Sequence, residues 1–232
     1  MTSTRIVTAY DWVPPFASGQ VRDLRLRWAL EEAGLPYEIE LVRMGTQTEA
    51  ENIARQPFGQ VPVLVEDGEA VFESGACLWR IATGSDALLP EDPAERQRCL
   101  SWVFAALNSI EPPLTMMAQL KFYEWSPERF GLPDGSSAST TLQPPVADWA
   151  HRRIGQFEDA LGGRDTIVGQ RFTVADIAVT AVLLIAERLD LLDAHEGAAR
   201  YFAAHTSRPA FRKAREAQMA THRENAAKYG AV

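Results

Sequence analysis

The chain has 232 residues, of which 46% are hydrophobic, so it can bury the core of one large domain or two small ones. Its formal net charge of -8 argues against nucleic acid as the main partner, because phosphate binding requires a basic surface. Residues 1–10 do not resemble a signal peptide, and the longest apolar run, residues 174–186, is too short to span a bilayer. We therefore expect a soluble, cytoplasmic protein with no membrane partner.

The first 83 residues predict the order β-α-β-α-β-β-α. Residues 5–10 are rich in β-branched side chains and predict a buried strand. Ser18 is the expected N-cap of a helix that ends at Ala33, with Gly34 in the left-handed conformation. Further elements are expected as a strand at 37–43, an irregular helix at 45–54, a hairpin of strands at 61–66 and 69–72, and a helix at 75–82 that Ser74 caps.

A linker rich in glycine and proline is expected at residues 84–93, and it separates residues 1–83 from an all-helical domain at residues 94–232. Pro112 and Pro113 are expected to kink or divide the first helix of that second domain. Its helices are predicted at 94–118, 144–161, 173–189, 198–205 and 209–221, with a surface loop at 126–141. The fold class is therefore an α/β domain followed by an all-α domain.

The histidines and cysteines show no metal-like spacing, so we expect no metal. Cys77 and Cys99 form no CxxC pair and are expected to be buried thiols in a reducing compartment, although a disulfide between them is a minority alternative.

Five segments carry a family resemblance. They are Trp28–Glu38, Gln56–Leu64, Phe72–Cys77, Thr173–Ile177 and Arg208–Phe211. In this order they resemble cytosolic glutathione transferases over nearly the whole chain, and the second segment is particularly similar to the phi class. The resemblance implies a thioredoxin-like N-terminal domain that holds glutathione and a helical domain that shapes the pocket of a second substrate. It also implies a homodimer and a role in detoxification.

The resemblance implies a glutathione site on two segments. Val61-Pro62 matches a cis-proline turn whose backbone pairs with glutathione, and Gln60 would bind through its amide. Glu73 and Ser74 would hold the ammonium and the carboxylate of the γ-glutamyl group at a helix N-terminus. The alternatives are an ordinary trans proline that opens an edge strand and a capping serine beside an exposed acid.

The residue that stabilises the glutathione thiolate stays open. The family's usual position falls near Gln20, which has no hydroxyl group. Ser18 is the first candidate and Tyr10 the second, and Arg22 could act through its charge. Ser18 could equally be a plain N-cap.

Three further assignments follow from the resemblance. The glycyl carboxylate would bind Gln47, Arg43 or a residue of a partner subunit. Thr173 and Asp176 would form a purely structural capping box. The wall of the electrophile pocket, or alternatively the bundle core, would contain Trp102, Leu107, Met116, Met117, Phe122 and Tyr123.

The expected activity is transfer of glutathione to a hydrophobic electrophile. Isomerase, dehalogenase and peroxidase reactions would use the same site, because a fold does not fix a reaction. The alternative is a non-catalytic ligand carrier or a regulatory interaction protein with the same fold.

Overall fold

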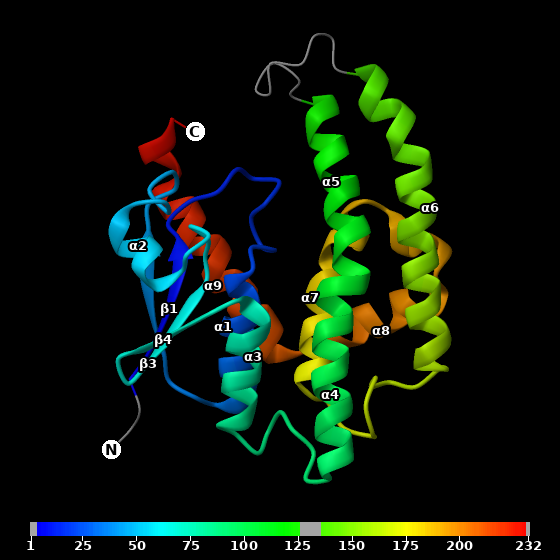
Figure 1. Cartoon of the computed structure of the whole chain (residues 1–232), viewed down its shortest axis with the longest axis horizontal. Coiled ribbons are helices and arrows are strands. Elements are labelled where there is room, and N and C mark those ends of the chain that lie inside the picture. The colour runs from blue at the N-terminus through cyan, green and yellow to red at the C-terminus, as the bar shows by residue number, and fades with distance from the viewer. Residues whose placement is uncertain (1–3, 126–135, 231–232) are drawn as a thin grey trace.

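The computed structural model describes residues 4–125 and 136–230, in which four strands form one mixed sheet (Figure 1). The sheet has the order β2-β1-β3-β4, with β1 and β2 parallel and the other neighbours antiparallel. The strands are β1 (Arg5–Tyr10), β2 (Glu38–Val42), β3 (Val63–Glu66) and β4 (Glu69–Phe72).

Three helices complete the N-terminal unit: α1 (Asp23–Ala33), α2 (Ala50–Arg55) and α3 (Ser74–Thr83). Helix α1 is the crossover between the parallel strands β1 and β2, and it ends at Gly34, whose φ of 64° is the predicted left-handed conformation. The predicted thioredoxin-like arrangement is confirmed.

The rest of the described chain is helical. Its elements are α4 (Pro93–Ala105), the π-helix η1 (Ala106–Ile110), α5 (Glu111–Trp125), α6 (Ser136–Leu161), α7 (Val174–Arg188), the short η3 (Leu191–Ala194), α8 (Glu196–Thr206), α9 (Pro209–Asn225) and η4 (Ala226–Tyr229). None of the helices within the described ranges has the length and apolar character needed to cross a membrane.

Helix α7 is the centre of the helical domain. Almost all of its residues are buried, which explains why its sequence is apolar on every face. Its N-terminus carries the predicted capping box: the Asp176 carboxylate accepts a hydrogen bond from the Thr173 backbone N–H at 2.8 Å, and Tyr201 donates its hydroxyl to the same carboxylate at 2.8 Å. The capping box is therefore tied into the core as well as to its own helix.

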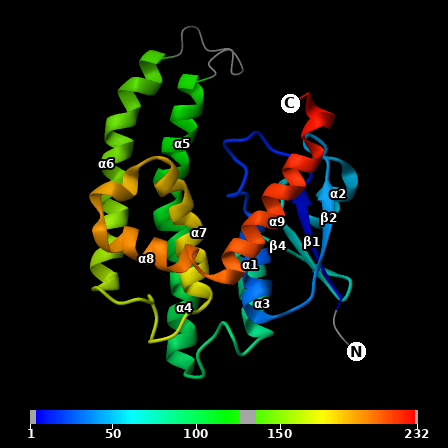
Figure 2. The ribbon, with the colours of Figure 1, turned by 180° about the vertical axis from the view of Figure 1, so that it is seen from behind.

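Helix α9 returns to the N-terminal domain and lies along α1 (Figure 2). Beyond it, Tyr229 of η4 stacks on Trp12 with ring centroids 4.7 Å apart and donates its hydroxyl to Asp11 at 2.7 Å. The C-terminal end thus contacts the loop that follows β1.

Several predicted boundaries were wrong. The irregular helix expected from residue 45 begins at Ala50, and the helix expected to end at residue 118 runs to Trp125. Helix α1 begins at Asp23 and not after Ser18, because the chain turns twice more within residues 14–22. Helix α6 begins at Ser136 and contains Pro144 and Pro145 in its interior, where both are exposed. Residues 126–135 of the predicted loop lie outside the described residues. Helix α9 runs four residues further than predicted, to Asn225.

Both cysteines are free thiols buried in the core. Burial raises the pKa of Cys77 to about 12, so this thiol is protonated and unreactive at neutral pH.

Candidate functional site

A cleft of about 1320 Å³ separates the N-terminal domain from α4, η1 and α5. One wall comes from α1, from the segment before β3 and from the start of α3. The other wall comes from α4, η1, α5 and α6. Gly75 of α3 allows the two walls to meet at the base, because a Cβ atom there would lie 2.5 Å from Cδ1 of Leu107.

The Val61–Pro62 peptide bond is cis, as the resemblance implied. Both residues are buried and line the cleft. They come just before β3, whose first residue Val63 donates its N–H to the Thr8 hydroxyl at 2.7 Å. Val61 therefore lies outside the strand ladder, just before the first paired residue of the inner strand β3.

Gln60 is exposed in the same wall, and the buried Gln56 lies beside it. The side chain of Gln56 accepts a hydrogen bond from the backbone N–H of Phe58, which fixes the loop before the cis bond. Gln56 was not predicted as a site residue.

Glu73 and Ser74 form the start of α3, and both line the cleft. The prediction that Ser74 is the N-cap was wrong. Glu73 occupies the cap position, with φ of 69° and ψ of 118°, and Ser74 is the first residue of the helix. The first intrahelical bond runs from the Cys77 N–H to the Glu73 carbonyl, so the earlier N–H groups of the helix have no intrahelical partner.

The hydroxyl of Ser74 accepts a hydrogen bond from Arg25 of α1, with Nη1 and Oγ 3.1 Å apart. The side chain of Arg25 is only 4% exposed, and its Nη2 lies 3.0 Å from Oε1 of Glu111. Arg22 contacts the same oxygen at 2.8 Å. This Arg22–Glu111–Arg25 cluster connects the two domains at the floor of the cleft.

The two arginines of the cluster keep the Glu111 carboxyl group ionised. Burial alone would raise the pKa of Glu111, but the charges and hydrogen bonds of Arg25 and Arg22 outweigh it, and the pKa lies below its ordinary value. Two guanidinium groups and one carboxylate leave a net positive charge. Sequence reasoning missed Arg25 and Glu111, because charged residues within helices are normally solvent-exposed.

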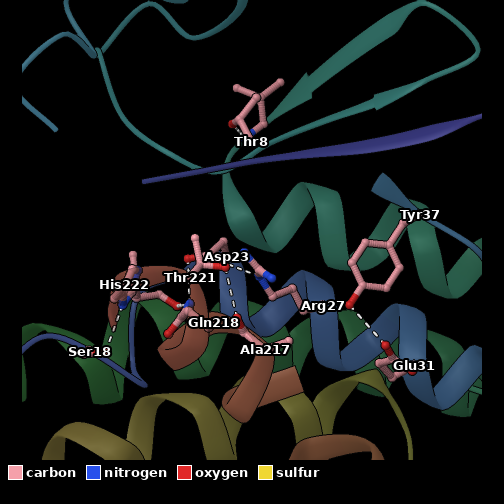
Figure 3. Close-up of polar contacts among 12 residues, drawn as sticks. Thr8, Ser18, Asp23, Arg27, Glu31, Tyr37, Ala217, Gln218, Thr221 and His222 are labelled. Carbon is pink, nitrogen blue, oxygen red and sulfur yellow. Dashed lines mark hydrogen bonds and ion pairs between the residues drawn. The ribbon is translucent and has the colours of Figure 1, made fainter. Parts of the chain in front are cut away.

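Ser18, the first catalytic candidate, is not among the described residues that line the cleft. Its hydroxyl lies 2.9 Å from Nδ1 of His222 on α9, as Figure 3 shows. The cause is the loop after β1. The N–H groups of Ala17 and Ser18 close turns on Pro14 and Pro15, which direct this serine toward α9.

Tyr10, the second candidate, also lies away from the described lining of the cleft, and burial raises the pKa of its hydroxyl. Arg22 is the one candidate of the three that lines the cleft, with 45% of its side chain exposed. The geometry therefore favours the Arg22 guanidinium over the hydroxyl groups of Ser18 and Tyr10 as the candidate for stabilising the thiolate.

The apolar wall contains only some of the predicted residues. Leu107, Met116 and Tyr123 line the cleft. Trp102 packs edge-on against Phe157, with ring centroids 6.1 Å apart. The remaining two predicted residues lie elsewhere: Met117 is in a small buried cluster and Phe122 packs on Phe16.

Neither Arg43 nor Gln47, which were predicted for the glycyl carboxylate, is among the described lining residues. The Gln47 side chain instead accepts a hydrogen bond from the Gly45 N–H at 2.9 Å. Of the three predicted partners of the glycyl carboxylate, only a residue of a partner subunit is left by this geometry.

Two family models match the chain. The N-terminal domain of glutathione S-transferase matches residues 24–83, and the C-terminal domain matches residues 114–209.

Individual relatives agree with these models. Glutathione S-transferase alpha-2 of Rattus norvegicus is 30% identical over 168 residues, or 71% of this chain and 69% of the relative. Glutathione S-transferase F10 of Arabidopsis thaliana is 35% identical over 117 residues, or 47% of this chain, and the chain spans about half of that protein's length (51%).

A solved structure is similar over most of the chain. It is a glutathione transferase from Burkholderia graminis with two glutathione molecules bound per subunit. It superposes with a TM-score of 0.75 at 25% identity, over 92% of this chain and 88% of the other.

Proposed function

Because the chain belongs to the glutathione transferase family, we propose that it binds reduced glutathione in this cleft and directs the thiolate at an apolar electrophile. One observation carries the proposal: the unpaired residue Val61 before β3, the start of α3 at Ser74 and the positive cluster of Arg22 and Arg25 line the same cleft. These three features match the peptide backbone, the γ-glutamyl carboxylate and the sulfur of glutathione.

The backbone of Val61 is proposed to pair with the cysteinyl part of glutathione as an added strand. The γ-glutamyl carboxylate would bind the N–H groups at the start of α3, where the helix dipole favours a negative charge. A serine hydroxyl has a single proton to donate, and in Ser74 it is free for the ligand because Arg25 occupies an acceptor position of the oxygen. Glu73 would receive the ammonium group, and Gln60 would contact the ligand through its amide.

Arg22 is proposed to stabilise the thiolate. A free thiol has a pKa of about 8.5, and a nearby positive charge lowers it toward neutrality. The thiolate then attacks the electrophilic carbon, and binding supplies the orientation. Isomerase, dehalogenase and peroxidase chemistry would use the same bound thiolate.

A second candidate is a protein that binds glutathione without turnover. It is favoured by the position of Ser18, whose hydroxyl faces His222 and not the cleft. Turnover of a generic aromatic electrophile with saturating glutathione separates the two, because a carrier binds the cofactor but forms no conjugate.

The experiment that tests the proposal is a calorimetric titration with reduced glutathione. The wild-type protein and the Ser18→Ala variant should show the same saturable binding, whereas Ser74→Ala should weaken it about 10-fold, as expected for a lost hydrogen bond to a charged group. No binding at millimolar glutathione, or equal affinity of Ser74→Ala and wild type, would contradict the assigned site.

We also propose a cytoplasmic homodimer, as implied by the family resemblance. Sedimentation velocity at two protein concentrations measures the oligomeric state, and a species with the mass of one chain at both concentrations would contradict the dimer.

A further inference from the structure

We propose that the cleft selects electrophiles that carry a hydrogen-bond donor, such as a hydroxyl group, and that the backbone carbonyls of Leu107 and Asn108 receive it. This inference rests on the proposed function and names the class of second substrate. It follows from the π-helix η1 and from the two prolines after it.

The π-helix is caused by the sequence Glu111-Pro112-Pro113. A proline ring inside a helix collides with the carbonyl four residues earlier and provides no N–H. The helix widens here, and the N–H of Glu111 bonds to the carbonyl of Ala106, five residues back. A regular α-helix resumes at Glu111.

This arrangement leaves two consecutive carbonyls without a helical donor. The carbonyl of Leu107 would normally pair with the N–H of Glu111, which is already used by Ala106, and the next residue is Pro112. The carbonyl of Asn108 faces Pro112 and Pro113 at the positions four and five residues ahead, and neither has an N–H. Both carbonyls are therefore free acceptors within the helix.

The two residues that carry these carbonyls lie in the wall of the cleft. Leu107, Asn108 and Pro112 all line it. Carbonyls on the open side of a helix tilt outward from its axis. A donor group of a ligand in the cleft can therefore replace water as the hydrogen-bond partner of these carbonyls.

Polar side chains continue the line of hydrogen-bonding groups from the two carbonyls along α5. Thr115 and Gln119 follow Asn108 at helical spacing, and all three are exposed and line the cleft. Met116 and Tyr123 form the neighbouring apolar surface. The wall therefore offers an apolar face beside a line of hydrogen-bonding groups.

This combination favours one substrate class. An apolar molecule without a donor would displace water from the two carbonyls and leave them unpaired, which costs affinity. A hydroxylated molecule replaces that water with its own O–H. A site built to hydrogen-bond a hydroxyl rejects the analogue that lacks it.

The test compares matched glutathione conjugates by calorimetry. The ligands are the ortho, meta and para isomers of S-(hydroxybenzyl)glutathione and the corresponding S-(methylbenzyl)glutathiones, with glutathione as the reference. At least one hydroxyl isomer should bind about 3- to 10-fold more tightly than its methyl counterpart, the range expected for one hydrogen bond.

Two proline variants locate the effect. Pro112→Ala places an N–H four residues after Asn108 and five after Leu107, so it supplies a donor to one of the two carbonyls and should weaken the hydroxyl preference. Pro113→Ala places an N–H four residues after Ser109 and five after Asn108 but leaves the Leu107 carbonyl without a donor, so a hydroxyl preference should remain. The affinity for glutathione itself should be the same in both variants, which controls for damage to the Glu111 cluster.

Equal affinity of every hydroxyl and methyl pair in a wild-type protein that binds glutathione would overturn the inference and leave the proposed function standing. A hydroxyl preference in Pro112→Ala that equals that of the wild type would overturn the role of the carbonyls. Failure of glutathione and all conjugates to bind would overturn the proposed function and the inference together.

Discussion

At the scale of single residues, Arg22 replaces Ser18 as the first candidate for the group that stabilises the thiolate. Arg22 lines the cleft with a half-exposed guanidinium, and Ser18 lies against His222 on the opposite side of the loop. The two residues are four positions apart in one short loop, so they form a matched pair for mutation.

We expect Arg22→Ala to raise the thiol pKa of bound glutathione by about one unit, the lower end of the range for a nearby charge, because Arg22 is partly solvated and already paired with Glu111. Ser18→Ala should leave this pKa unchanged. The measurement is the ultraviolet absorbance of the thiolate as a function of pH. A shift in the Ser18 variant with none in the Arg22 variant would restore the serine as the stabilising group.

At the scale of elements, sequence patterns predicted turns and helix caps, which depend on the backbone preferences of a few residue types. The hairpin at Asp67-Gly68 and the cap at Thr173 appear where expected, because each depends on the properties of one or two residue types. The cis bond before Pro62 was implied by the family resemblance and not by the residue types alone. The start of α6 was missed, because prolines were expected in a first turn and not in the exposed interior of a helix.

The capping box of α7 gives a prediction at this scale. Thr173→Ala should lower the free energy of unfolding by about 1–2 kcal/mol, because it removes a buried N-cap from the central helix. Thr206→Ala, at the end of α8, is the matched control and should have little effect. Urea denaturation of both variants measures the difference, and equal midpoints would argue against a stabilising cap.

At the scale of the whole molecule, the site depends on contacts between elements that no local pattern reveals. Arg25 and Glu111 are 86 residues apart in sequence, and they meet only because α1 and α5 come together at the floor of the cleft. A helical periodicity predicts that both are polar surface residues. Sequence reasoning therefore predicted the segments that are proposed to bind glutathione but not the charges behind them.

Glu111→Ala should destabilise the protein by about 3–5 kcal/mol, because it leaves the buried Arg25 without its counter-charge. The exposed Glu124→Ala is the control and should keep the wild-type midpoint in the same denaturation experiment. A small effect in the Glu111 variant would mean that water replaces the carboxylate.

The same contact predicts a pH dependence. The pKa of folded Glu111 lies below its ordinary value of 4.5, so its stabilising contribution is fully present above that value and is lost as the pH falls through the lower folded pKa. The Glu111→Ala variant should therefore lose less stability than the wild type over this acid range.

The return of α9 has a consequence for how the protein is made. Asp23 is held by Gln218 at 2.7 Å, Ser18 by His222 and Asp11 by Tyr229, so three polar residues of the first loop and the start of α1 have partners among the last 15 residues described. A ribosome releases the N-terminal residues first, and domains commonly fold in that order. Here these contacts of residues 11–23 can form only once residues 218–229 have been synthesised.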